Sequence, residues 1–184
     1  MRKQLLKLFI TVPLLLAFVP LRLAEGQDMR NRTPRFEYYS LGRQQKNLGE
    51  IIGISRPDSN ESTAQFRKRI REAAGKGPNF AGHYSVVGWS CGMICINLTV
   101  VNVKTGRIHD TPFMGIGDGP CPTGFYEKER RLVHFKMNSR LLILRGAAED
   151  FGPAGMFHDA PCSTRYYVWK ANRLVLVKEV FAGN

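Results

Sequence analysis

The feature that most constrains this fold is a repeated pairing of short segments with alternating apolar residues across a turn. One such segment places Tyr84 and Val86 on one side and Val87 and Trp89 on the other. This alternation is typical of β-strands, and turn residues between the segments are typical of hairpins. The segments cover residues 83–91, 95–103, 107–111, 131–137, 140–145, 164–170 and 173–180. We therefore expect a predominantly antiparallel β-meander, either one twisted sheet or a small half-open barrel.

Three short turn sequences indicate where the strands reverse. Residues 104–106 (Lys-Thr-Gly) precede the third segment. Residues 138–139 (Asn-Ser) and 171–172 (Ala-Asn) are each flanked by two alternating segments, which predicts two-residue hairpin loops.

A single amphipathic helix is expected before the first strand, which makes the fold class α+β. Ser62 and Gln65 have the spacing of a capping box. Phe66 and Ile70 then begin an apolar helical face, and Gly75 is placed to end the helix in the left-handed conformation.

The opposite face of this helix is basic. Arg67, Lys68 and Arg71 lie on it, and most runs of this kind are simply a solvated surface. The functional alternative is an anion-binding stripe on this helix. Trp89 is a further candidate binding residue.

The N-terminus has the features of a secretory signal peptide over residues 1–26. Arg2, Lys3 and Lys7 precede an apolar run at residues 8–19, which is shorter than the ~20 residues of a membrane span. The alternative is a retained anchor. We expect an irregular arm at residues 27–57 and one domain at 58–184, with periplasmic or extracellular localisation and no membrane span in the mature chain.

Removing the signal peptide leaves 158 residues, of which 23 are basic and 14 acidic, a net charge of +9. This excess favours an acidic protein or an anionic envelope polymer as partner. A nucleic-acid partner is not expected, because the basic residues are dispersed and no nucleic-acid motif is present. The oligomeric state is left open.

All four cysteines lie in the mature part and suit an oxidising compartment. Three pairings are formally possible. The spacing favours Cys91–Cys95 across a hairpin tip and Cys121–Cys162 between two glycine-rich loops. A thiol or metal protein built on Cys91 and Cys95 is the weakest alternative, because the spacings match no common zinc module. We expect no metal and no cofactor.

Candidate catalytic residues are few, and no catalytic signature supports them. His83 at the start of a strand is either a buried structural histidine or a general base. Asp118, His158 and Asp159 lie in the two glycine-rich loops, which a Cys121–Cys162 bridge would join. These four residues define an alternative function, a small hydrolase.

Residues 77–84 read Gly-Pro-Asn-Phe-Ala-Gly-His-Tyr, and residues 89–95 read Trp-Ser-Cys-Gly-Met-Ile-Cys. With the Lys-Thr-Gly turn, this stretch resembles a group of small exported bacterial proteins of no established activity. The resemblance is strongest over residues 66–110. It implies export and a shared fold, and it carries over no catalytic residue. The function we expect is therefore binding, to an anionic envelope component or an acidic protein.

Overall fold

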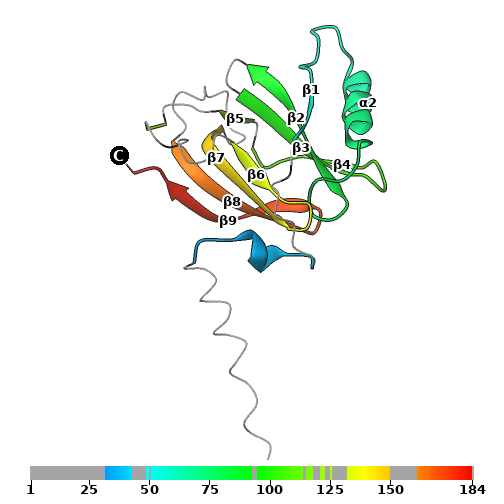
Figure 1. Ribbon diagram of the computed structural model, residues 1–184. Coiled ribbons are helices and arrows are strands. Elements are labelled where there is room, and N and C mark those ends of the chain that lie inside the picture. The colour runs from blue at the N-terminus through cyan, green and yellow to red at the C-terminus, as the bar shows by residue number, and fades with distance from the viewer. Residues whose placement is uncertain are drawn as a thin grey trace, which may run out of the picture. The chain divides into compact units, whose positions relative to one another are not determined.

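The computed structural model describes residues 32–42, 49, 51–92, 95–113, 115–117, 121–122, 125, 132–149 and 161–183. The chain divides into two compact units, Met1–Arg32 and Thr33–Asn184. The elements below belong to the second unit (Figure 1). The predicted signal peptide lies outside the described residues.

The described residues form one sheet in the order β1-β2-β3-β5-β7-β8-β9, with β4 paired to β3 and β6 paired to β7. All pairings are antiparallel except β1 with β2. The strands are β1 (Ile52–Ile54), β2 (Tyr84–Gly92), β3 (Cys95–Asn102), β4 (Ile108–His109), β5 (Gly115–Gly117), β6 (Val133–Phe135), β7 (Leu141–Glu149), β8 (Cys162–Lys170) and β9 (Arg173–Phe181). This largely antiparallel sheet and a single α-helix among the described residues confirm the α+β class.

The two faces of β2 are both covered, as its alternation predicts. Tyr84 and Val86 belong to a core that also contains Leu142 of β7 and Trp169 of β8. Side chains of β2, β7 and β8 therefore share one core. On the other face of β2, Val87 packs in a second cluster with the helix.

Helix α2 (Thr63–Ala74) begins at the predicted capping box. The backbone N–H of Gln65 donates to Ser62 Oγ at 3.3 Å, and the Ser62 N–H donates to Gln65 Oε1 at 2.8 Å. These two bonds satisfy donors that the first turn leaves without a helical partner. Ile70 and Ala73 are buried against Val87 of β2.

The predicted left-handed end of the helix at Gly75 is wrong. Gly75 has φ −61° and ψ −13°, within the right-handed helical region, and its N–H donates to Arg71 O at 2.9 Å. The chain leaves the helix two residues later, where Gly77 has φ +119°. The last turn continues past Gly75 because the hydrogen bond from Lys76 N to Ala73 O keeps it wound.

The stretch between the helix and β2 is held by the side chain of Asn79. Its amide donates to Val86 O at 3.2 Å and accepts from Val86 N at 2.7 Å, in the manner of a neighbouring strand. Phe80 pairs with Tyr84 across a tight loop in which Ala81 has φ +45°. The conspicuous sequence at residues 77–84 is thus a structural turn that starts β2.

One of the two predicted hairpin loops is present. Lys170 pairs with Arg173, and Ala171 and Asn172 have φ of +50° and +60°, as a type I′ turn requires.

The two-residue loop predicted at residues 138–139 is wrong. In the β6–β7 hairpin the last pair is Phe135 with Leu142, and the connection between the two strands spans residues 136–140. Ser139 is drawn instead toward the N-terminal segment, where it bridges Ser40 and donates its hydroxyl to Phe36 O at 3.1 Å.

The segment expected to be an irregular arm contributes to the domain. It contains a 3₁₀ helix, η1 (Phe36–Tyr39), whose aromatic side chains pack near Leu141 and Tyr166. Strand β1 also lies within the arm, where Ile52 pairs in parallel with Val87. The second compact unit, Thr33–Asn184, therefore includes part of this arm.

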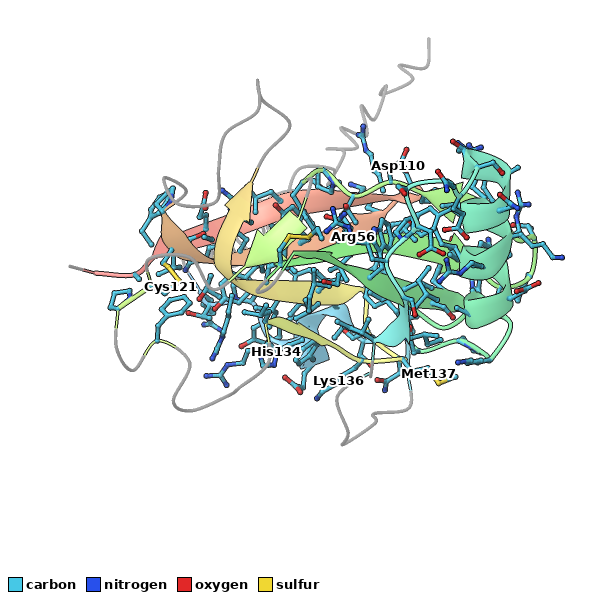
Figure 2. All side chains as sticks on the ribbon, turned by 90° about the horizontal axis from the view of Figure 1, so that it is seen from above. Arg56, Asp110, Cys121, His134, Lys136 and Met137 are labelled. Carbon is cyan, nitrogen blue, oxygen red and sulfur yellow. A yellow bond between two sulfur atoms is a disulfide. The ribbon has the colours of Figure 1, made fainter. Side chains whose placement is uncertain are left out.

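Both favoured disulfides are present. Cys91 and Cys95 close the β2–β3 hairpin with their Cα atoms 5.1 Å apart, and Cys121 and Cys162 have Cα atoms 5.2 Å apart. Figure 2 shows Cys121 at the end of the domain away from α2. The disulfides suit an oxidising compartment. Among the described residues, no helix has the length and apolar character of a membrane span.

Candidate functional site

A cleft of about 610 Å³ lies between α2 and the sheet. The helix supplies Thr63, Phe66, Arg67, Ile70 and Arg71 to its wall. These positions are spaced by three and four residues, so they form one stripe along the helix. The cleft therefore runs along the length of α2.

The cleft opens where β3 changes its neighbour. Strand β4 pairs with β3 at residues 100–101, and β5 pairs with it at residues 95–96. Residues 97–99 of β3 lie between these two pairings, beside the connecting segment at residues 110–113. Both stretches line the cleft.

Two threonine hydroxyls occupy this break in the ladder. Thr99 Oγ1 donates to His109 O at 2.8 Å, and both groups are buried. The hydroxyl of Thr111 lies 3.3 Å from Leu98 O and 3.0 Å from Phe113 O. Side chains thus satisfy carbonyl groups that a continuous pairing would have bonded, and buried carbonyls require such partners. The broken ladder is a stable feature of the fold.

Three arginines from two parts of the chain line the cleft. Arg67 and Arg71 come from α2, and Arg107 comes from the turn before β4. Arg71 Nε donates to Gly106 O at 3.4 Å, which joins the helix to that turn. Within the described residues, the guanidinium groups of Arg67 and Arg107 make no hydrogen bond or ion pair. Two of the three cations are therefore available to a ligand.

One carboxylate shares this cleft. Asp110 lines it and is exposed, and among the described residues it forms no ion pair with the three arginines. Figure 2 shows Asp110 at the end of the domain where α2 lies. The cleft therefore combines an excess of positive charge with one acceptor-only group.

Aromatic rings form one wall of the cleft. Phe66 of α2 and Trp89 of β2 meet edge to face, with ring centroids 5.0 Å apart. Both side chains are half-buried, so part of their apolar surface faces the cleft. Such a wall suits the apolar portion of a ligand whose charged portion meets the arginines.

The structure brings three of the four predicted binding residues together. Arg67, Arg71 and Trp89 line the cleft. Lys68 does not: its side chain is 77% exposed and lies 3.8 Å from Glu72 Oε1, on another side of the helix.

Sequence reasoning missed Arg107 and Asp110. In the sequence, both residues flank a two-residue strand that follows a Lys-Thr-Gly turn. Only the fold shows that this turn faces the helix.

The catalytic candidates are only partly described. His83 is half-buried, and its ring lies against Tyr84 with centroids 4.3 Å apart. It has no hydrogen bond to a carboxylate within the described part of the chain. Asp118, His158 and Asp159 lie outside the described residues, so the predicted hydrolase site stays a prediction.

The two disulfides leave none of the four cysteines with a free thiol. The alternative thiol or metal site at Cys91 and Cys95 needs free thiols, so the structure does not support it.

A second histidine lies just behind the cleft. His109 is buried, and its ring packs against Tyr84 and Trp169 with centroid distances of 6.2 and 5.4 Å. Burial lowers the pKa of His109 below its ordinary value of 6.5, and the nearby Arg107 lowers that pKa further. A hydrogen bond to the backbone of Asn172 opposes this shift. His109 is thus a neutral core side chain near neutral pH.

No family model, curated protein or solved structure matches this chain. The function of the cleft therefore has to be argued from its own residues.

Proposed function

We propose that this protein is an exported binding protein whose cleft between α2 and the sheet holds an acidic group of its partner. The partner is an acidic protein or an anionic component of the cell envelope. The signal peptide expected at residues 1–26 and the two disulfides support export.

The observation that carries this proposal is the convergence of Arg67, Arg71 and Arg107 on one cleft. A guanidinium presents a planar fork of donors that matches a carboxylate or phosphate. At an effective dielectric of about 20, a pair of unit charges at about 4 Å interacts by roughly 4 kcal/mol before desolvation. The guanidinium groups of Arg67 and Arg107 have no partner among the described residues, so both can form such an ion pair with a ligand.

The scaffold supports a preformed site. Much of the cleft wall belongs to α2 and the sheet, which hold side chains more precisely than loops do, while Arg107 and Asp110 flank strand β4. We propose that the sheet is a half-open barrel and that α2 is an amphipathic helix, with one face on the sheet and its basic stripe beside the cleft. Binding would then cost little conformational freedom, because the side chains of the site are already ordered.

Charge reversal on the helix tests the proposal. Arg67→Glu places a carboxylate in the cleft, whereas Lys68→Glu makes the same charge change one residue away on another side of α2. We expect Arg67→Glu to weaken binding of poly-L-glutamate by about tenfold or more at low salt, the effect of about 1.4 kcal/mol. Lys68→Glu should change it by less than about threefold.

Both dissociation constants are measured by titration calorimetry at two salt concentrations, because screening weakens a surface ion pair. Equal losses in the two variants would show a diffuse charge effect and would contradict a site in the cleft. Unchanged binding in both variants would contradict it as well.

A further inference from the structure

We infer that the cleft is built for an acidic peptide segment of a partner protein, with Asp110 accepting an N–H group of that segment. This inference rests on the proposed function and narrows its ligand. It separates a peptide from the other anionic candidates, which are polyphosphates, lipid headgroups and acidic polysaccharides.

Asp110 places a negative charge beside the arginines of the cleft. This carboxylate lines the same cleft as Arg67, Arg71 and Arg107, yet within the described residues it pairs with none of them. It therefore does not serve to neutralise an arginine. A ligand made only of closely spaced anionic groups would be repelled by Asp110, since like charges in a partly desolvated cleft oppose binding.

The carboxylate of Asp110 requires a hydrogen-bond donor from any ligand that covers it. Asp110 is exposed in the free protein, where water satisfies it. An ionised aspartate only accepts hydrogen bonds, so a ligand that covers Asp110 without supplying a donor costs free energy. A peptide supplies backbone N–H groups beside its acidic side chains. Polyphosphate supplies acceptor oxygens with few donors, so it satisfies the arginines and leaves Asp110 unpaired.

The cleft also has an apolar wall. Phe66, Trp89 and Ile108 are half-buried and line the cleft beside the charged groups. A peptide that alternates acidic and apolar side chains presents both kinds of group at short spacing, whereas a hydrophilic polyanion has nothing to cover this surface. The volume of about 610 Å³ lies within the range of pockets that bury small ligands.

The charge of Asp110, its need for a donor and the apolar wall together define the expected contacts. Carboxylates of the peptide meet the guanidinium groups of Arg67 and Arg107, an apolar side chain lies against Trp89, and a backbone N–H donates to Asp110. The distinguishing residue is Asp110, because it favours a peptide and disfavours a pure polyanion.

The test compares two probes on three proteins. The probes are a short peptide of alternating glutamate and leucine, blocked at both ends, and inorganic polyphosphate. The proteins are the wild type, Asp110→Ala and Glu72→Ala. Glu72 is an exposed acid of α2 whose side chain lies outside the cleft, so Glu72→Ala matches the change in net charge.

Asp110→Ala should weaken peptide binding by roughly tenfold, the size of one charge-assisted hydrogen bond. The same variant should tighten polyphosphate binding by several-fold. Glu72→Ala should leave both dissociation constants within about twofold of the wild type. Effects of opposite sign on the two probes are the signature of the inference.

If Asp110→Ala tightens the peptide as well as polyphosphate, Asp110 only repels anions, and the inference is overturned while the proposed function stands. Wild-type protein that prefers polyphosphate over the peptide also overturns it. Arg67→Glu serves as the separate control: if it changes neither probe, the proposed function itself fails.

Discussion

Phe66 of α2 and Trp89 of β2 pack edge to face with ring centroids 5.0 Å apart, and this contact joins the helix to the sheet at the wall of the cleft. The helix is otherwise held by small and aliphatic side chains such as Ile70 and Ala73. The same aromatic pair thus fixes the position of α2 and shapes the proposed binding surface.

Truncation of Phe66 should therefore loosen the helix. We expect Phe66→Ala to lower the free energy of unfolding by about 2 kcal/mol, less than for a fully buried phenylalanine because this ring is half-buried. Phe66→Leu should cost less than half as much. Urea unfolding of the oxidised protein measures both values, and an unchanged stability in Phe66→Ala would show that the ring pair does not hold the helix.

The two disulfides should contribute unequally to stability. Cys121 and Cys162 are 41 residues apart in sequence, whereas Cys91 and Cys95 are four apart. The chain-entropy model assigns about 4 kcal/mol to the longer loop and about 2 kcal/mol to the shorter one.

Paired replacement by serine tests this difference by thermal unfolding. The Cys121→Ser/Cys162→Ser protein should be the less stable of the two double variants. The reverse order would show that contacts near the hairpin tip outweigh loop closure.

Burial of His109 predicts a loss of stability in mild acid. Its pKa is lowered in the folded protein, so below its ordinary value of 6.5 the unfolded chain binds a proton more readily than the folded chain does. The stability therefore falls as the pH decreases below about 6.5, by at most about 1.4 kcal/mol per pH unit for this one group.

His109→Gln removes the titrating group, and the other histidines are common to both proteins. We expect the wild type to lose stability relative to His109→Gln between about pH 7.5 and about pH 5, measured by urea unfolding. A stability difference between the two proteins that is constant over this range would contradict the prediction.

The edge strand β9 is anchored by a partly buried ion pair. Arg165 Nε donates to Glu179 Oε1 at 2.6 Å, and the hydroxyl of Ser163 donates to the same oxygen at 2.8 Å. Removing one charge of a buried pair leaves the other desolvated without full compensation. Glu179→Gln should therefore lower the free energy of unfolding by about 2 kcal/mol.

Arg173→Gln is the matched control, because Arg173 lies at the exposed start of the same strand. It should change the stability by less than about 0.5 kcal/mol, as exposed substitutions usually do. Equal effects of Arg173→Gln and Glu179→Gln would mean that the pair adds nothing to the edge strand.

Elements fixed by neighbouring residues could be predicted from the sequence. The start of α2 at Ser62 and the turn at residues 171–172 depend on local backbone and capping preferences, and both are present. The disulfide pairs also agree with the spacing argument.

Elements fixed by distant contacts could not be predicted in this way. The β6–β7 loop is longer than expected because Ser139 bonds the backbone of Phe36, about 100 residues earlier in the chain. Asp110 joins Arg67 in the cleft because β4 ends after two residues and the chain leaves the sheet there. No local sequence pattern predicts that β4 ends there.

The most direct test of the proposed site uses the two tryptophans of the chain. Trp89 lines the cleft, whereas Trp169 is 5% exposed within the core. The two indole N–H resonances are recorded by NMR during titration with poly-L-glutamate and assigned with a Trp89→Phe variant. Our account predicts that the Trp89 resonance shifts in a saturable manner while that of Trp169 stays in place. Binding that leaves the Trp89 resonance unmoved would place the ligand elsewhere and contradict the account.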